Sequence, residues 1–404
     1  MRVLQIHAPY RQGGGEDAVV RDEASLLRAA GHEVVEHKVP NPHAHAETLT
    51  ALALAAWNPA AARQVSRVVK RCQPDVAHVH NTWFRLSPSV PSVVHDLGVP
   101  VVMTLHNYRL LCVNGLLMRQ GRVCEDCVGT HPWRGVLHRC YHGSMPLSAV
   151  AASAIAVGRA RHTWDHAIDR YIAPSAFTAA RITAGGVPSE KITVKPHGVE
   201  DPGARPESAA QSSSVLFVGR LSPEKGLHVL LDAWERVVPA SLQLIIVGEG
   251  PQREVLERRR IKGVQFLGWC DRHEVRRLML TARALVFPSI WYESFALTVV
   301  EALAAGLPVL AADLGAAGEI VRALGPDWLV RSADADGWAA ALEQLENNST
   351  VGLAGQRARA TFEAKFTLQH SLAQLLDIYS AVAEESGVPG GTDHVRGVAN
   401  RHGG

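Results

Sequence analysis

Residues 286–309 read VFPSIWYESFALTVVEALAAGLPV, which combines a strand, a loop, a helix and the start of a second strand. The first strand is predicted to end at Pro288, and a helix beginning near Ala296 is predicted to end at Gly306. A strand, a helix and another strand in succession are typical of parallel sheets covered by helices. This stretch therefore predicts an α/β fold.

Two acidic residues of this stretch are candidates for ligand binding. Glu293 lies in the loop, and Glu301 stands in the second turn of the helix among apolar neighbours. A buried carboxylate needs polar partners, and ribose hydroxyls would supply them. The alternative is a solvent-facing Glu on an amphipathic helix. The free backbone N–H groups at the helix start, at Phe295, Ala296 and Leu297, suit a phosphate group.

The same alternation of strand and helix extends over the chain in two series. Strands are predicted at residues 3–7, 33–37, 76–80, 99–106, 170–173 and 191–195, and then at 215–218, 242–247, 264–267, 284–288 and 309–311. The stretch Asp201–Ser213, rich in Pro, Ser, Ala and Gly, is the best candidate for a linker between the series. Two α/β halves joined in this way form a cleft at their strand ends, where ligands usually bind.

Three further strand ends in the second series carry candidate ligand-binding residues. Arg220 and Lys225 follow a glycine turn five residues apart, and together they offer the fixed positive charge that a diphosphate needs. The alternative is that both side chains are solvated cations on the surface that bind no ligand. Gly248 ends a buried strand, and Trp269 follows a small-residue turn at Gly268. Such turns let backbone approach a ligand, although each alone fits an ordinary structural turn equally well.

The first strand of the chain leads into a second glycine-rich segment. Residues 13–16 read GGGE and open a helix, so Gly14 and Gly15 combine close backbone approach with a helix N-terminus that favours an anion. A flexible turn is the alternative. His80 and His106 end two neighbouring strands and are expected to line the cleft.

Composition limits the class of protein. The 404 residues are 47% hydrophobic and 20% charged, with a formal net charge of +2. This length predicts two or three domains, and the near-neutral balance gives no reason to expect nucleic acid as a partner. The N-terminus lacks the apolar core of a signal peptide, and no apolar run is long enough for a membrane span. A cytoplasmic protein is expected, with peripheral contact at the inner membrane face left open.

Four of the six cysteines fall within a short segment. Cys112, Cys124, Cys127 and Cys140 are spaced as Cys-x11-Cys-x2-Cys-x12-Cys, inside a loop-rich insert at residues 111–143. Four thiolates suit a structural zinc with no open position for catalysis. Reduced cysteines that merely pack, and one or two disulfides, are the alternatives. Three nearby histidines could replace one ligand, namely His131, His138 and His142.

Taken together, these segments resemble the retaining glycosyltransferases of family 4, which have the GT-B fold of two Rossmann-like parallel-sheet domains facing a central cleft. The Glu-x7-Glu pair at Glu293 and Glu301 and the Gly-Arg-x4-Lys-Gly segment at Arg220 and Lys225 carry the resemblance. It covers nearly the whole chain. The resemblance implies an N-terminal acceptor-side domain at 1–200 and a nucleotide-sugar domain at 201–365. A terminal helix at 366–385 would pack back on the N-terminal domain, before a disordered tail at 386–404.

The resemblance also implies residue roles and partners. Arg220 and Lys225 would hold the diphosphate of a UDP- or GDP-sugar and stabilise it as it leaves. Glu293 would contact hydroxyls of the transferred hexose, Glu301 would bind the ribose, and His106 would lie beside the sugar. The remaining donor-binding residues would be Gly14, Gly15, Gly248, Trp269, Phe295, Ala296 and Leu297. The acceptor would be a glycan, a lipid-linked sugar or a small molecule, and catalysis would require no cofactor. Many members have glycines where this chain has Ser294 and Ala296, which bears on the identity of the sugar.

Two alternatives share this architecture: a non-catalytic sugar-nucleotide-binding protein and a sugar-nucleotide epimerase. A binding protein would be expected to have lost Arg220, Lys225 or Glu293, and all three are present. A dehydrogenase is excluded because no Gly-x-Gly-x-x-Gly, with an acidic residue about 20 positions on, follows the first strand.

Overall fold

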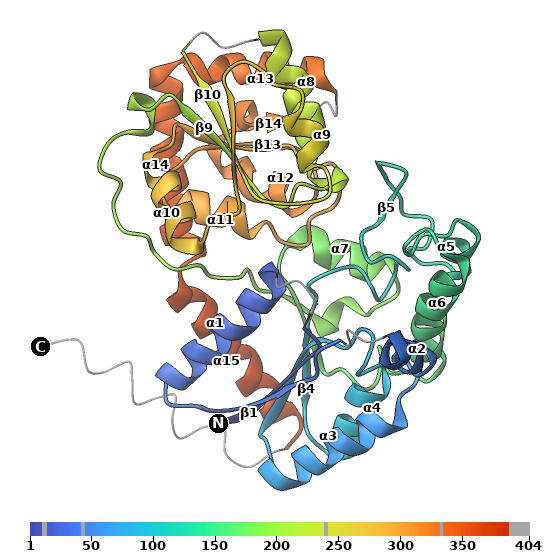
Figure 1. Cartoon of the computed structure of the whole chain (residues 1–404). Coiled ribbons are helices and arrows are strands. Elements are labelled where there is room, and N and C mark those ends of the chain that lie inside the picture. Colours follow the sequence, from blue (N-terminus) through green and yellow to red (C-terminus); the bar gives the residue numbers. More distant parts are fainter. Residues whose placement is uncertain (10–13, 42–44, 238–240, 332–333, 388–404) are drawn as a thin grey trace, which may run out of the picture.

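The computed structural model describes residues 1–9, 14–41, 45–237, 241–331 and 334–387. Two six-stranded parallel sheets, each covered by helices, form two domains that meet at a waist (Figure 1). The prediction of two Rossmann-like parallel-sheet domains is thus confirmed.

The N-terminal sheet has the strand order β2-β1-β3-β4-β7-β8. Its four central strands are almost completely buried, as in other parallel sheets covered by helices, whereas the two edge strands are only partly buried. The strands are β1 (Arg2–His7), β2 (Glu33–Lys38), β3 (Val76–Asn81), β4 (Val101–Thr104), β7 (Arg170–Ala173) and β8 (Ile192–Val194). The helices are α1 (Gly15–Ala29), α2 (His45–Ala53), α3 (Pro59–Cys72), α4 (Ser89–Asp96), α6 (Met145–Ala160) and α7 (Ala176–Ala184).

The C-terminal sheet has the corresponding order β11-β10-β9-β12-β13-β14. Its strands are β9 (Ser214–Val218), β10 (Gln243–Val247), β11 (Val264–Gly268), β12 (Ala284–Phe287), β13 (Val309–Ala312) and β14 (Leu329–Val330). The helices are α8 (Leu227–Val237), α9 (Arg253–Glu257), α10 (Arg272–Thr281), α11 (Leu297–Ala304), α12 (Gly315–Val321), α13 (Ala335–Glu343) and α14 (Asn348–Lys365). Trp234, Trp338 and Phe362 are fully buried between this sheet and its helices.

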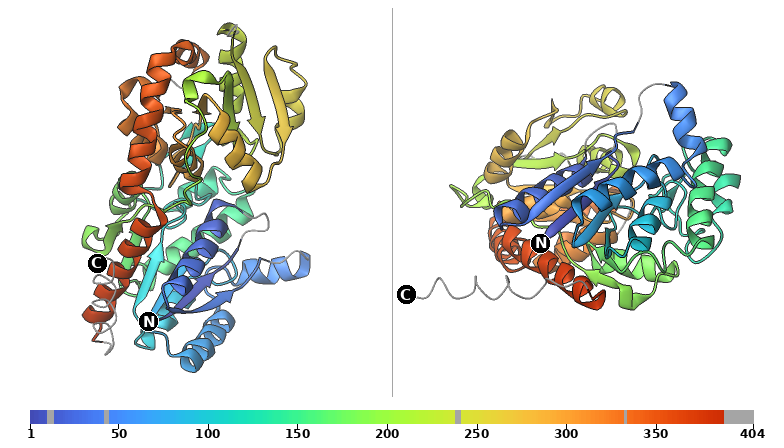
Figure 2. Two further views of the ribbon diagram at one scale, coloured as in Figure 1. Left: turned by 90° about the vertical axis from the view of Figure 1, so that its left-hand side faces the viewer. Right: turned by 90° about the horizontal axis from the view of Figure 1, so that it is seen from below.

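The chain crosses between the domains twice, and the two crossings lie side by side. The backbone N–H of Val199 donates to the carbonyl oxygen of Phe366 at 3.0 Å. Beyond this point α15 (Leu368–Glu385) returns to the N-terminal sheet, where Leu375 and Tyr379 are buried against β1, β3 and β4 (Figure 2). Most of the predicted disordered tail, residues 388–404, lies outside the described residues.

Residues 111–143 form a compact excursion between β4 and α6. It contains a two-stranded hairpin, β5 (Met118–Arg119) with β6 (Arg122–Val123), and the single-turn helix α5 (Trp133–Leu137). Helix α6 begins directly after this excursion, at Met145, because the Ser144 hydroxyl caps it by accepting a hydrogen bond from the N–H of Leu147. Within the described ranges, no helix combines the length and the hydropathy needed to cross a bilayer.

Candidate active site between the two domains

A cleft of about 420 Å³ lies between the domains, at the carboxyl ends of the strands. Gly14 and Asp22 line it from the N-terminal domain, and Trp269, Leu297 and Glu301 line it from the C-terminal domain. A second hollow of about 190 Å³ adjoins it and shares Glu301. Together these spaces are of the size that holds small ligands. Four residues predicted from the sequence, Gly14, Trp269, Leu297 and Glu301, are thus brought to one cleft.

The glycine segment before α1 closes one end of this cleft. Gly14 is the N-cap of α1, and its backbone N–H donates to the Asp17 carboxylate at 3.0 Å. A Cβ on Gly15 would lie 2.8 Å from the side chain of Leu297, the first residue of α11. A glycine at position 15 therefore allows the N-terminal domain to approach the helix start that was predicted to face a phosphate.

The carboxylate of Glu293 is buried and held from one side. Its Oε1 accepts hydrogen bonds from Lys225 Nζ at 2.6 Å, Ser289 Oγ at 2.9 Å and Trp291 Nε1 at 2.9 Å. Its Oε2 makes no hydrogen bond with any described residue, so it is available to a ligand hydroxyl. Ser289 and Trp291 were not singled out from the sequence, although they lie in the same loop.

Two glycines bring the basic residues into place. Gly226 has a φ of +69°, and a Cβ there would lie 1.9 Å from the carbonyl oxygen of Pro288, so the backbone after Lys225 can touch this loop. A Cβ on Gly248 would lie 1.9 Å from the carbonyl oxygen of Gly219, so glycine lets the ends of β9 and β10 meet. Arg220, which follows Gly219, is exposed, and its guanidinium makes no ion pair or hydrogen bond with the described part of the chain.

Glu301 lies at the cleft wall, and its carboxylate forms no ion pair with any residue that the structure describes. Burial raises its pKa, and Asp22 raises it further, while Arg272 and Arg276 act in the opposite direction. Asp22 also forms an ion pair with Arg272 across the cleft, with 3.3 Å between Oδ2 and Nη1. A carboxylate in this setting gains from hydroxyl donors supplied by a ligand.

Aromatic residues at the cleft have different roles. Trp269 is 73% exposed at the cleft edge, which leaves its ring free to stack on a planar group. The ring of Phe295, in contrast, packs against His197 and Phe366, at 5.0 and 6.3 Å between ring centroids. The side chain of Phe295 is therefore structural, and only its backbone remains a candidate for ligand contact. Ala296 is buried as the N-cap of α11.

A row of imidazoles, called here the histidine row, runs from the N-terminal sheet to the cleft: His78, His80, His106 and His197. His80 Nδ1 lies 3.1 Å from His106 Nε2, and the rings of His106 and His197 stack at 5.4 Å. Burial lowers the pKa of His106 well below its usual value, with further contributions from nearby positive groups. His106 is therefore a neutral imidazole at pH 7. His197 is its stacking partner and also lines the cleft.

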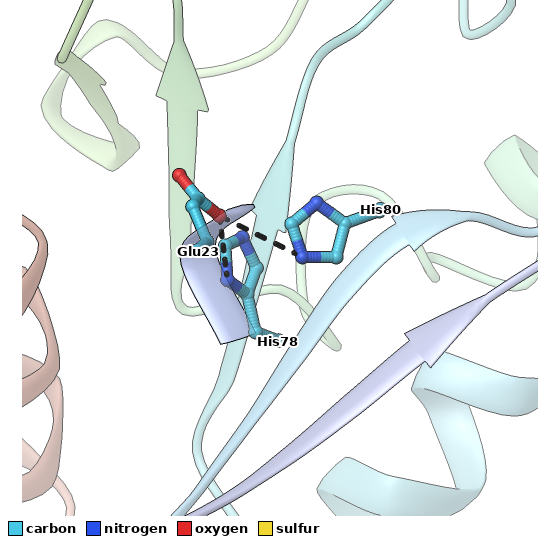
Figure 3. A group of neighbouring side chains, drawn as sticks. All are labelled: Glu23, His78 and His80. Atoms are coloured by element: carbon cyan, nitrogen blue, oxygen red, sulfur yellow. Dashed lines mark ion pairs between the residues drawn. The ribbon is translucent and has the colours of Figure 1, made fainter. Parts of the chain in front are cut away.

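The inner end of the row meets a buried acid. Glu23 Oε2 lies 3.9 Å from His78 and 3.8 Å from His80 (Figure 3), and Glu23 Oε1 pairs with Lys195 Nζ at 2.9 Å. Burial raises the pKa of Glu23, but Lys195 and His78 outweigh it and hold that pKa below its usual value. Because Lys195 already supplies the positive charge, this group fits a structural network better than a metal centre.

The loop that carries Glu293 is fixed to the N-terminal domain through Ser294. The Ser294 hydroxyl donates to the carbonyl oxygen of His106 at 2.5 Å. The Ser294 carbonyl in turn accepts hydrogen bonds from Ser175 Oγ at 3.0 Å and Thr178 Oγ1 at 3.1 Å. The sequence showed that Ser294 departs from the family pattern, but it could not show that this hydroxyl connects the two domains.

A smaller pocket opens in the N-terminal domain next to His106. It is lined by Asn81, Trp83 and Arg109 together with apolar residues of α6. The Arg109 guanidinium lies 4.7 Å from the centre of a Trp83 ring, a cation–π distance. A pocket on the N-terminal side of His106 is placed to receive a second substrate.

The family comparisons cover most of the chain. The model of Glycosyltransferase Family 4 matches residues 13–201, and the model of Glycosyl transferases group 1 matches residues 212–348. A phosphatidyl-myo-inositol mannosyltransferase of Mycolicibacterium smegmatis is 27% identical over 416 residues, covering 96% of this chain and 94% of that protein. Its counterpart in Mycobacterium leprae is 33% identical over 175 residues, which cover 42% of this chain and 47% of that protein.

Solved structures share the fold. Sucrose-phosphate synthase from Thermosynechococcus elongatus has a TM-score of 0.70 at 18% identity, covering 95% of this chain and 99% of its own. Anabaena HepE in complex with UDP has a TM-score of 0.67 at 19% identity, covering 94% and 100%. The cleft, the positions of Glu293 and Glu301 and these matches agree with one another. The chain therefore belongs to the family 4, group 1 glycosyltransferases and has their GT-B fold.

Proposed function

We propose that this glycosyltransferase moves a hexose from a UDP- or GDP-sugar to a glycan, lipid-linked or small-molecule acceptor, with retention of the anomeric configuration. The observation that carries the proposal is the half-satisfied Glu293 carboxylate. Lys225, Ser289 and Trp291 occupy one oxygen, and the other is left for a sugar hydroxyl.

The donor diphosphate would be held by charge that the protein supplies. Lys225 lies beside Glu293, and Arg220 is exposed without a partner among the described residues. Two fixed cations and the free N–H groups at the start of α11 can stabilise the negative charge that develops as the diphosphate leaves. Catalysis in this arrangement requires no divalent cation.

Retention would follow from attack on the face that the diphosphate leaves. In that geometry the departing phosphate accepts the proton of the acceptor hydroxyl, and the protein has to exclude water and hold both substrates. The neutral His106 imidazole, which lines the acceptor-side pocket, would hydrogen-bond the sugar without adding charge.

A lipid-linked acceptor would bring the protein to the cytoplasmic face of a membrane. The mycobacterial relatives are phosphatidyl-myo-inositol mannosyltransferases. In this chain Trp133 and Leu137 of α5 are 47% and 74% exposed, and Arg134 and Arg139 lie between and after them. Apolar and basic side chains in one surface segment favour anionic bilayers. Flotation with anionic vesicles is expected for the wild type and not for Leu137→Glu; equal flotation would remove this part of the proposal.

The reaction itself is tested with a panel of UDP- and GDP-sugars and with glycan, lipid-linked and small-molecule acceptors. Release of free nucleotide that depends on the acceptor, with an α-linked product from an α-linked donor by NMR, is expected. A changed sugar nucleotide without acceptor would indicate an epimerase, and tight binding without turnover of any pair would indicate a binding protein.

A further inference from the structure

We infer that Cys112, Cys124, Cys127 and Cys140 bind one structural zinc ion as four thiolates. All four line a single small cavity of about 10 Å³ in the insert, although they are spread over 29 residues of sequence. A space of about 10–15 Å³ holds one water-sized particle, and so it suits one ion and no ligand of greater size.

The side chains are close enough to interact but are not yet in a tetrahedral arrangement. Burial raises the pKa of Cys140 to about 11, with smaller contributions from the nearby sulfurs of Cys112, Cys127 and Cys124. Among the described residues, no three of these sulfurs lie within 4.8 Å of one another. In a tetrahedral site the sulfurs would be about 3.8 Å apart, given Zn–S bonds of about 2.3 Å. Metal binding therefore requires the cysteine side chains to rotate toward the cavity.

Positive charge surrounds the cavity. Binding of Zn²⁺ by four thiols releases four protons and leaves a net charge of −2 on the site. Arg134 and Arg119 line the cavity, and Arg119 has a buried Nη1 with no hydrogen-bond partner in the described residues, although its Nη2 pairs with the Asp126 carboxylate, also at the cavity, at 3.2 Å. Arg159 approaches from α6, near Cys127. These three guanidinium groups would offset the charge of a tetrathiolate site.

A metal ion would add stability to an insert whose apolar contacts are few. Its own apolar contacts are divided between two small clusters, one around Cys112 and Leu117 and another that includes Cys140. The first cluster packs against Phe177 and Tyr292, and Tyr292 directly precedes Glu293 in the sequence. A metal ion that joins the two clusters would hold the insert against the loop of the active site. It would take no part in the transfer because four protein ligands leave no open position.

His138 also lines the cavity, so the ligand set needs its own test. His131 and His142, the other histidines considered from the sequence, do not line it. We assign the four sulfurs as the zinc ligands. Cys112 and Cys127 are buried at the cavity, and four sulfurs complete a tetrahedral site without an imidazole.

The experiment is elemental analysis of the full chain, purified under reducing conditions without added metal. One zinc per chain is expected in the wild type, in His138→Ala and in Cys72→Ser, whose cysteine lies outside the insert. Cys124→Ser is expected to retain less than about a tenth of that zinc. Cobalt exchanged into the wild type should give the strong visible bands and the thiolate charge-transfer band of a tetrahedral thiolate site.

Three results would overturn the inference, and none of them depends on enzymatic activity. The first is zinc far below one per chain with all six thiols free, and the second is a mass that shows disulfides among these four cysteines. The third is loss of zinc in His138→Ala. If Cys124→Ser fails to fold, the cobalt spectrum of the wild type decides the question.

Discussion

Burial of the Glu301 carboxylate lowers the stability of the folded protein, and the same carboxylate is proposed to bind the donor. Burial raises its pKa, so the folded state holds the proton more tightly than the unfolded state does. Stability therefore falls as the pH rises from the ordinary glutamate value through the raised one, and the cost is fully present above it. Binding of ribose hydroxyls would give this carboxylate a function that explains why it is buried despite the loss of stability.

Glu301→Gln separates these two effects. The variant is expected to melt at a higher temperature than the wild type at neutral pH, because no charge is buried, and the difference should vanish at low pH. Its kcat/KM for the donor should fall roughly 30- to 1,000-fold, which corresponds to about 2–4 kcal/mol of transition-state stabilisation. Thermal melts across pH and steady-state kinetics measure both. A gain in stability with unchanged kinetics would place Glu301 outside the donor site.

Lys225→Ala tests the cation beside Glu293. Removing the ammonium takes away the proposed phosphate ligand and the partner of a buried carboxylate, so kcat/KM should fall by at least the same factor as for Glu301→Gln. Lys225→Arg, which keeps the charge, should recover part of the rate, and the exposed Lys262→Ala is the matched control. Equal rates for Lys225→Ala and Lys262→Ala would contradict the assignment.

Some of the candidate site residues could be located from the sequence alone, and others could not. Glu293, Glu301, Arg220 and Lys225 were located from the spacing of charged residues around strand ends, which is a local pattern. Ser294 could not be assigned a role in this way. Its bonds to His106 and Ser175 join positions more than a hundred residues apart in sequence.

The elements of the fold follow from apolar periodicity to a large extent. Each strand predicted from an apolar run is present, because those runs are long enough to show burial on both faces of a sheet. The hairpin β5–β6 and strand β14 were missed. Each of these strands has two residues, too few for a periodic signal.

The histidine row makes the stability of the folded protein depend on pH. Burial lowers the pKa of His78 to about 4, and it lowers the pKa values of His80, His106 and His197 well below 6.5. The unfolded chain then binds more protons than the folded chain below pH 6.5, so stability falls as the pH decreases. For His78 alone, a shift from 6.5 to about 4 corresponds to about 3 kcal/mol.

We therefore predict a steep loss of the free energy of unfolding between about pH 6.5 and pH 4. The slope should be reduced in His78→Gln and unchanged in His273→Gln, whose imidazole is exposed. Denaturant unfolding at several pH values measures the slope. A wild-type stability that does not change over this range would show that the row is not held neutral.

At the scale of the whole molecule, the two domains contact each other on both sides of the proposed site. Gly15 and Leu297 nearly touch across the cleft, and the Glu319 carboxylate accepts the N–H groups of Ala176 and Phe177 at 3.0 and 2.7 Å. The two sheets were predictable from the sequence. Their mutual contacts were not, because they join segments with no shared pattern. The expectation that the cleft binds a nucleotide-sugar came from the family resemblance and not from the periodicity of apolar residues.

The two cations at the donor site also predict independence from divalent metal. Activity is expected without added Mg²⁺ or Mn²⁺ and should persist in a chelator that does not extract tightly bound structural zinc. The physical reason is that, in the proposed donor site, Arg220 and Lys225 would already neutralise the diphosphate. Assays with and without chelator check this. A complete loss that Mg²⁺ restores would show that the cations are insufficient.

The central claim is that Lys225, Glu293 and Glu301 form the donor site of an active glycosyltransferase. Its most direct test measures acceptor-dependent release of nucleotide from a panel of UDP- and GDP-sugars by the wild type, Lys225→Ala and Glu293→Gln, with Lys262→Ala as control. The account predicts turnover of at least one donor by the wild type and the control, and a loss of at least roughly 30-fold in the two site variants, each still folded by thermal melt. Turnover by the two site variants at the wild-type rate would contradict it.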